Sequence, residues 1–265
     1  MNTHLLAIDC QNDFCLPDGS LYVQGADGDM SRLSKMVEKM GGKLDDIHVT
    51  MDSHQILHIA HPAFWVDKDG NHPVPFTLIS HDDVVNRAWS PFIEALRPWG
   101  LEYTEQLESN KRYALCIWPP HCIIGTTGHA LHKDFSDAIN SWAVQQKGLV
   151  DFVTKGSCLL TEHYSAVQAD VVRDDDPTTQ LNESVIETLA QADRILIAGE
   201  ALDFCVANTI RDIAATFGDD NVKKFVLLED ACSCVNAPGL EHLGNDFVND
   251  MKALGMQVST TSDIM

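Results

Sequence analysis

Short continuous apolar runs alternate with helical periods along this chain. The apolar runs predict strands at residues 5–9, 46–51, 150–154, 195–198, 224–229 and 257–259. Amphipathic spacing predicts helices at residues 31–40, 128–146, 182–192 and 240–254, and another that follows Cys205 and ends at Phe217. This alternation is typical of βαβ units. We therefore predict an α/β fold, with a mostly parallel, doubly wound (Rossmann-like) sheet of six strands and helices on both faces.

Residues 59–116 interrupt this alternation. They are poorly periodic and rich in proline, tryptophan, glycine and histidine. Such a segment is expected to be a long, partly ordered excursion, and long loops in compact domains are usually functional. No internal repeat or interdomain linker is visible, so residues 1–265 are expected to form a single domain with this inserted loop region.

The charge balance restricts the partners. The chain carries 39 acidic and 18 basic residues, a formal net charge of −21. This excess repels nucleic acid and anionic membranes, so we expect neither as a partner and expect a small substrate. No apolar run is long enough to span a bilayer, and the first residues lack a signal-peptide pattern, which favours a cytoplasmic protein. Its eight scattered cysteines are then expected to be mostly free thiols.

Three predicted strands are followed by residues that can do chemistry. Asp9, Lys155 and Cys205 stand beyond the carboxyl ends of these strands, the edge at which open α/β sheets bind ligands. A carboxylate can accept the proton of a neighbouring thiol, and a lysine beside both favours the thiolate. A helix that begins near Cys205 is also expected to lower the pKa of its thiol. The ordinary alternatives are a turn cap for Asp9, a surface position for Lys155 and a buried thiol for Cys205.

A second polar group has the composition of a metal site. Asp52 and His54 follow the strand at 46–51, and His121 comes from the segment Trp118-Pro-Pro-His121. One carboxylate and two imidazoles suit Zn²⁺, Fe²⁺ or Mn²⁺ and leave positions open for water or a ligand nitrogen.

His58 and His61 stand next to this group in the sequence. Twelve histidines in 265 residues are expected to cluster to some extent by chance. We therefore interpret these two as part of a histidine-rich surface loop, with a role as an extra metal ligand left open.

Five motifs carry a resemblance to a known family. They are Asp9-Cys-Gln-Asn-Asp-Phe14, Asp52-Ser-His54, Trp118-Pro-Pro-His-Cys122 with Gly125-Thr-Thr-Gly128, Thr154-Lys-Gly156 with Tyr164-Ser165, and Gly199-Glu-Ala-Leu-Asp-Phe-Cys205. In this order and spacing they make nearly the whole chain similar to the isochorismatase-like cysteine hydrolases, and within them to the nicotinamidases. The resemblance implies hydrolysis of nicotinamide to nicotinate and ammonia, and it favours a homodimer or larger homo-oligomer.

The resemblance also implies roles for individual residues. Asp9, Lys155 and Cys205 would form a catalytic triad, with Cys205 as nucleophile and Asp9 as general base and later acid. The backbone N–H groups of Ala201 and Cys205 would form an oxyanion hole behind a cis peptide bond that precedes Ala201.

The implied ligand contacts complete this picture. Asp52, His54 and His121 would hold one divalent metal, with zinc expected first and iron or manganese as alternatives, and the metal would bind the pyridine nitrogen. Phe14 and Trp118 match aromatic residues that sandwich the ring, and Gln11 is a further expected substrate contact.

Some positions depart from the nicotinamidase pattern. Glu200 stands where an apolar residue is usual and Leu202 where threonine is usual, and the insertion is longer than in short members. Another small amide or a carbamoyl compound is therefore the alternative substrate class. A noncatalytic binding protein of the same fold and a redox role for Cys232 and Cys234 are weaker alternatives.

Overall fold

A computed structural model describes residues 1–110 and 113–265. Its central sheet has six strands in the order β10-β9-β8-β1-β2-β7, and all neighbouring strands are parallel. The strands are β1 (Thr3–Ile8), β2 (Asp46–Asp52), β7 (Val150–Lys155), β8 (Arg194–Gly199), β9 (Phe225–Leu228) and β10 (Gln257–Ser259). The prediction of a mostly parallel six-stranded sheet is confirmed. Strands β1 and β8 are almost entirely buried, which explains their uninterrupted apolar runs.

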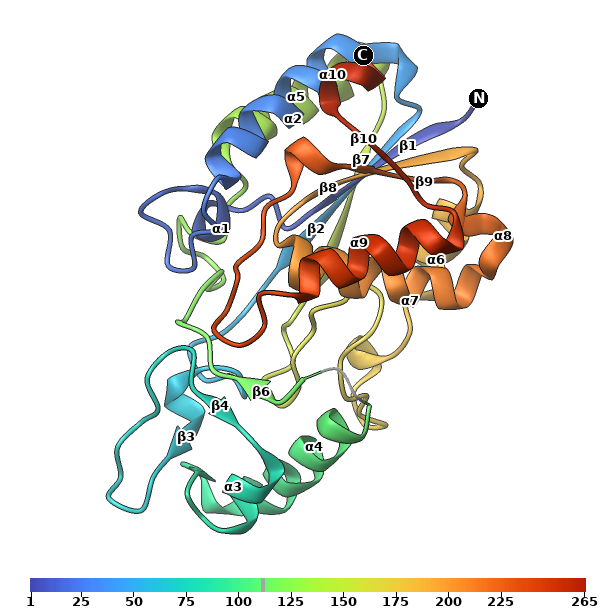
Figure 1. Ribbon diagram of the computed structural model, residues 1–265. Coiled ribbons are helices and arrows are strands. Elements are labelled where there is room, and N and C mark those ends of the chain that lie inside the picture. The colour runs from blue at the N-terminus through green and yellow to red at the C-terminus, as the bar shows by residue number, and fades with distance from the viewer. Residues whose placement is uncertain (111–112) are drawn as a thin grey trace.

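Helices cover both faces of this sheet (Figure 1). On one face lie α2 (Ala26–Met40), α5 (Lys133–Gln146) and the short α10 (Thr261–Ile264). On the other lie α6 (Glu183–Ala190), α7 (Ala207–Phe217), α8 (Asp219–Val222) and α9 (Leu243–Leu254). The sheet is therefore doubly wound, as predicted, and the short α1 (Asn12–Cys15) directly follows the end of β1.

Two helix starts differ from the prediction. Helix α2 begins at Ala26 rather than at residue 31, because its polar first turn hides the helical period. Helix α5 begins at Lys133 rather than at residue 128. The preceding residues bond instead to the segment after β1, where Asn12 N–H donates to the Ala130 carbonyl at 2.8 Å.

The insertion contains more regular structure than its sequence suggests. Strands β3 (Trp65–Val66) and β5 (Ser90–Pro91) pair, β4 (Leu78–Ile79) pairs with β6 (Leu115–Cys116), and α3 (His81–Val85) and α4 (Arg97–Ser109) pack beside them. Sequence reasoning missed α4 because Pro98 and Gly100 read as breakers. Proline is compatible with a first helical turn, however, and a Cβ at Gly100 would lie 2.9 Å from Pro91 Cγ.

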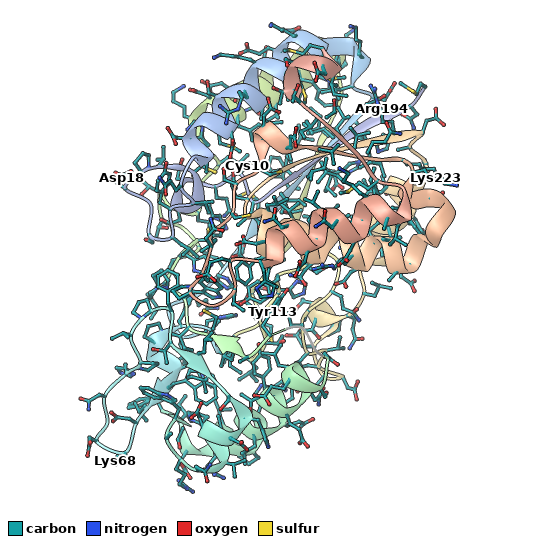
Figure 2. The ribbon with its side chains drawn as sticks, viewed as in Figure 1. Cys10, Asp18, Lys68, Tyr113, Arg194 and Lys223 are labelled. Carbon is teal, nitrogen blue, oxygen red and sulfur yellow. The ribbon has the colours of Figure 1, made fainter. Side chains whose placement is uncertain are left out.

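The insertion extends away from the sheet as a lobe. Lys68 marks its tip, and Arg194 at the start of β8 lies at the opposite side of the molecule (Figure 2). Residues 111 and 112 of the predicted excursion lie outside the described residues. Within the described ranges, no helix has both the length and the apolar character that a membrane crossing requires. The cytoplasmic location and the homo-oligomer stay predictions.

Candidate active site and metal centre

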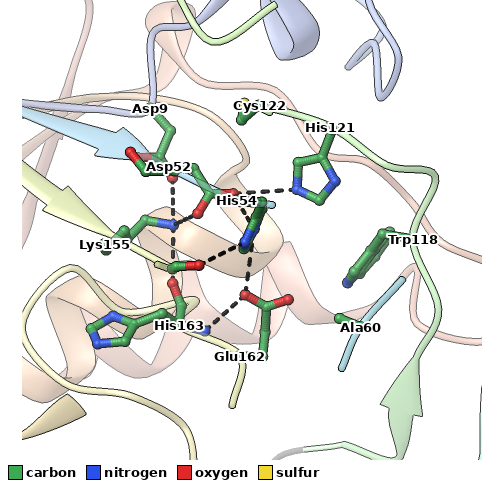
Figure 3. Close-up of polar contacts among 12 residues, drawn as sticks. Asp9, Asp52, His54, Ala60, Trp118, His121, Cys122, Lys155, Glu162 and His163 are labelled. Carbon is green, nitrogen blue, oxygen red and sulfur yellow. Dashed lines mark hydrogen bonds and ion pairs between the residues drawn. The ribbon is translucent and has the colours of Figure 1, made fainter. Parts of the chain in front are cut away.

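Three adjacent strands bring their terminal charged residues together. Asp9 follows β1, Asp52 ends β2 and Lys155 ends β7. Lys155 Nζ lies 2.9 Å from Asp9 Oδ2 and 3.1 Å from Asp52 Oδ1, and all three side chains are buried (Figure 3). Burial alone would lower the pKa of Lys155, but the two carboxylates outweigh it and hold that pKa well above its usual value. The lysine is therefore a fixed positive charge between two acids.

The backbone at Asp9 is in the left-handed region, with φ of 48°. This conformation is uncommon for a residue other than glycine and is often found at functional sites. Thr50 of β2 holds it: Asp9 N–H donates to Thr50 Oγ1 at 3.0 Å, and the same hydroxyl donates to Asp9 Oδ1 at 2.5 Å. Backbone and carboxylate of Asp9 are thus both fixed by one neighbouring side chain.

Cys205 lies in a π-helical turn, Leu202–Val206, that leads into α7. Lys155 Nζ donates to its Sγ at 3.5 Å. The expected lowering of the thiol pKa is not found: burial raises the pKa of Cys205 well above its usual value, Lys155 opposes this shift, and Asp9 and Asp52 add to it. Burial is also the main cause that raises the pKa of Asp9. A neutral thiol therefore lies beside a carboxylate with increased proton affinity.

The predicted metal ligands also converge. Asp52 Oδ2 lies 3.0 Å from His54 Nε2 and 3.2 Å from His121 Nε2 (Figure 3). His54 Nδ1 is 2.9 Å from the Gly156 carbonyl, and His121 Nδ1 is 2.8 Å from the Pro119 carbonyl. An Nδ1–H that donates to a carbonyl leaves the Nε2 lone pair free, as in metal-binding histidines. Carboxylate and imidazole donors are thus oriented toward one point.

The electrostatics of this centre also suit a cation. Of three buried carboxylates in this centre, Asp9 and Asp52 contact the Lys155 ammonium, and Glu162 Oε1 lies 3.8 Å from His54 Nε2. Burial disfavours a charged His54 ring, yet Asp52 and Glu162 raise its pKa to about 9. This surplus of buried negative charge fits a divalent metal ion.

Gly156 is required by the same packing. Its φ is +79°, and a Cβ there would lie 2.7 Å from Asp52 Oδ1 and 2.8 Å from His54 Cε1. A side chain at this position would displace two of the predicted ligands, which explains glycine directly after Lys155.

His58 and His61 are buried beside His54, so their interpretation as a surface loop is wrong. The two rings have different partners. His58 Nε2 faces the Thr161 carbonyl at 3.2 Å, and its Nδ1 accepts from Ala60 N–H at 3.3 Å.

His61 keeps one ring nitrogen free for a ligand. Its Nδ1 faces the Gln55 carbonyl at 3.2 Å, whereas its buried Nε2 has no hydrogen-bond partner in the described part of the chain. His61 is therefore better suited than His58 to add a donor.

A cavity with about 350 Å³ of free space, its open mouth included, is lined by Cys205 of the predicted triad and by Asp52 and His121 of the predicted metal ligands. Phe14, Trp118, Tyr164 and Phe204 lie in its wall, which suits a small aromatic ligand. Its lining residues are Phe14, Leu21, Asp52, Trp118, His121, Glu162, Tyr164, Ala201, Phe204, Cys205 and Val235. The predicted substrate contacts Phe14 and Trp118 are therefore in the cavity wall, as are both residues predicted for the oxyanion hole.

Sequence reasoning missed several of these lining residues. Glu162 and Tyr164 lie in the loop after Lys155, and the Tyr164 hydroxyl accepts from Trp118 Nε1 at 2.8 Å. Phe204 packs edge to face on Trp118, with ring centroids 5.0 Å apart. Their position directly beyond β7 and next to Cys205 was the available signal.

Gln11 does not line this cavity, in disagreement with its prediction as a substrate contact. Its side-chain Nε2 donates to the Asp52 carbonyl at 2.8 Å and to the His129 carbonyl at 2.9 Å. Its Oε1 accepts from Asp52 N–H at 2.7 Å. Gln11 instead fixes the backbone of a metal ligand.

Glu200 is likewise absent from the cavity wall. The peptide bond between Glu200 and Ala201 is cis, as the resemblance implies. The buried Glu200 carboxyl accepts from Ser233 N–H at 3.0 Å, and burial followed by the nearby Asp29 raises its pKa well above the usual value. Because Val235 of the same loop lines the cavity, Glu200 supports the wall without touching its contents.

A parallel sheet that brings an aspartate, a lysine and a cysteine together beyond its carboxyl edge is the arrangement expected of an α/β cysteine hydrolase. Comparison with known proteins agrees. The chain is 27% identical over 266 residues to a nicotinamidase of Acinetobacter baylyi, covering 100% of this chain and 95% of that protein. It is 26% identical over 205 residues to a nicotinamidase of Saccharomyces cerevisiae, covering 77% and 78%. Over its whole length the chain is thus similar to nicotinamidases, which are isochorismatase-like cysteine hydrolases.

Solved structures show the same fold. A nicotinamidase/pyrazinamidase of Acinetobacter baumanii superposes with a TM-score of 0.67 at 23% identity, covering 100% of this chain and 98% of that one. A Pyrococcus horikoshii pyrazinamidase in complex with zinc gives a TM-score of 0.55 at 19% identity, covering 98% and 99%. No protein-family model matches the chain.

Proposed function

We propose that this protein is a metal-dependent amidohydrolase that converts nicotinamide to nicotinate and ammonia with Cys205 as its nucleophile. One observation carries the proposal. The Cys205 thiol, beside Lys155 and Asp9, lies in the wall of the same small aromatic cavity as Asp52 and His121. A heteroaromatic amide is a ligand that needs both groups at once. The nicotinamidases among the relatives support this substrate class.

The chain's own residues account for the chemistry in two stages. Asp9 accepts the thiol proton as sulfur attacks the amide carbon, and backbone N–H groups of Ala201 and Cys205 stabilise the oxyanion. Asp9 then returns the proton to the leaving nitrogen, which departs as ammonia and leaves a thioester on Cys205. Asp9 next deprotonates a water molecule that attacks the thioester, so nicotinate leaves and the thiol re-forms.

Lys155 stabilises the charged forms of the groups that exchange this proton. Its ammonium lies between Asp9 and Asp52 and touches the thiol sulfur, so it favours ionised Asp9 and the developing thiolate. Its Nζ also donates to the His163 carbonyl at 3.0 Å, which holds it in place.

Asp52, His54 and His121 would hold one divalent metal, for which zinc is our first choice. When bound, such a metal orients a ring nitrogen and withdraws electrons from the substrate carbonyl. The Gly156 and Pro119 carbonyls bind the Nδ1 atoms of His54 and His121 and leave both Nε2 atoms beside Asp52 Oδ2, as a metal site requires. The zinc complex of the Pyrococcus horikoshii pyrazinamidase agrees with this choice.

A substrate series tests the proposal. Ammonia release is measured with zinc-loaded protein on nicotinamide, pyrazinamide, benzamide, a carbamoylated amine and an aliphatic amide. Benzamide is the matched control because it has the size of nicotinamide but no ring nitrogen. We expect kcat/KM for nicotinamide to exceed that for benzamide by about 10²-fold or more, because benzamide has no ring nitrogen and leaves the buried polar groups of the site without a partner. Equal rates on the two, or activity on the carbamoyl compound alone, would contradict the assignment.

The free Nε2 of His61 leads to a separate prediction. We propose His61 as an additional metal-binding or metal-supporting residue, and His61→Ala is expected to weaken zinc affinity about 10- to 100-fold. His58→Asn is the matched control, because both His58 ring nitrogens already have backbone partners. Zinc competition with a chromophoric chelator measures both variants, and equal affinity in His61→Ala and the unchanged protein would exclude the role.

A further inference from the structure

A second cluster of histidine and aspartate lies at the other end of the sheet. His4 is in β1, Asp46 and His48 are in β2, and Asp151 is in β7. In the parallel register His4 lies opposite Asp46, and His48 lies opposite Asp151. Residues two apart in a strand, and register partners on its neighbours, share one face of a sheet. All four side chains therefore emerge on the same face.

Three donor atoms of this cluster lie close enough to hold one metal ion. His4 Nδ1 is 3.0 Å from His48 Nε2, and His48 Nε2 is 3.8 Å from Asp46 Oδ2. One ligand atom from each of these residues lies within 4.8 Å of the other two. Two imidazole nitrogens and one carboxylate oxygen form a donor set for zinc and other borderline divalent metals.

Asp151 supplies the outer contact that such a site needs. Its Oδ2 lies 3.0 Å from His48 Nδ1. A carboxylate that accepts the Nδ1 proton leaves the Nε2 lone pair free and makes the ring a better ligand, an arrangement common around zinc-binding histidines. The orientation of His48 is thus set from the side opposite His4.

The cluster is both protected and accessible. The two histidine rings are buried, whereas the Asp46 and Asp151 side chains are 35% and 47% exposed. An open groove between the sheet and α6 is lined by Asp46, His48 and Asp151. An ion can therefore approach from solvent past the exposed carboxylates and meet His48 in the wall of the groove.

This cluster is separate from the catalytic cavity. His48 and Asp52 are four residues apart along β2, which corresponds to about 13 Å in a strand. None of its residues lines the cavity or contacts the triad in the described part of the chain. Its occupation can be measured without reference to the amidase reaction.

We propose that His4, Asp46 and His48 form a second binding site for a zinc-class divalent cation, with Asp151 as its outer partner and water completing the coordination. The alternative is that the same contacts form only a chain of hydrogen bonds from His4 through His48 to Asp151, with no metal bound. The number of ions bound by the chain distinguishes these two cases.

The test counts bound zinc in the full chain without an affinity tag. Protein stripped of metal is titrated with Zn²⁺ against a chromophoric chelator, and its metal content is measured after dialysis. The unchanged protein is expected to bind two ions. His121→Asn removes a ligand of the catalytic centre. In this background the proposed site is expected to bind Zn²⁺ and not Mg²⁺, because magnesium prefers oxygen ligands.

Two conservative variants then locate the remaining ion. In the His121→Asn background, Asp46→Asn removes the ligand carboxylate and Asp151→Asn removes the negative charge of the outer partner. Each is expected to weaken Zn²⁺ binding at least about tenfold. Both side chains are partly exposed, and circular dichroism checks that the variants fold. Unchanged zinc affinity in both would overturn the proposal. The proposal would also be overturned if the remaining ion were lost on replacement of His58 or His61 and retained in Asp46→Asn.

Discussion

Replacement of Cys205 by alanine is expected to lower kcat for ammonia release from nicotinamide by at least about 10⁴-fold, the scale seen when a catalytic nucleophile is removed. The loss is expected because no thioester intermediate can form without the sulfur, so water must attack a resonance-stabilised amide directly. Because the thiol is buried with Lys155 and Asp9 in contact range, no other cysteine in the described residues is placed to substitute for it. Steady-state ammonia release with zinc-loaded protein measures the loss.

The control is Cys158→Ala, a partly exposed cysteine that does not line the cavity. It is expected to retain kcat within about twofold, as surface substitutions usually have small effects. Zinc content should be the same in both variants, because neither thiol is a predicted ligand. If Cys205→Ala retained a tenth of the original kcat with intact zinc content, the nucleophile would have to be assigned elsewhere.

The centre of the sheet could be predicted because β1 and β8 are buried on both faces. β1 and β8 therefore appear in the sequence as continuous apolar runs that end at a polar or glycine residue. Asp9 and Lys155 could be found because parallel strands place their carboxyl ends at one edge of the sheet. Helix α4 could not, because its proline and glycine read as breakers. Pro98 is accommodated by its place in the first turn, and Gly100 packs closely against Pro91 of the insertion.

Side-chain direction and burial account for what the sequence could not reveal about the site. Gln11 lies between two residues of the correct motif, but its amide binds backbone rather than the cavity. His58 and His61 look like loop residues until the fold buries them against His54. The thiol pKa depends on a balance of burial and neighbouring charges, and no spacing in the sequence gives that balance.

Asp9→Asn is the second large prediction, because the proposed reaction passes every proton through this one carboxylate. Asparagine has the same shape but cannot accept the thiol proton. Because both stages use this carboxylate, kcat is expected to fall about 10³- to 10⁴-fold, in the upper part of the usual range of about 10²- to 10⁴-fold for a general base. Zinc affinity should stay within a few-fold, because Asp9 is not among the three convergent ligands.

The pH dependence of kcat/KM separates a base from a merely structural aspartate. Asp9 must be ionised to act, so activity is lost as pH falls through its pKa, and burial places that pKa above the usual aspartate value. Thr50→Val removes a hydroxyl that donates to Asp9 Oδ1 and lowers this pKa. The acid limb of the profile should therefore move to higher pH in Thr50→Val. An unmoved acid limb in Thr50→Val, together with the same limb persisting in Asp9→Asn, would assign the ionisation to another group and leave Asp9 as a positioning residue for Lys155.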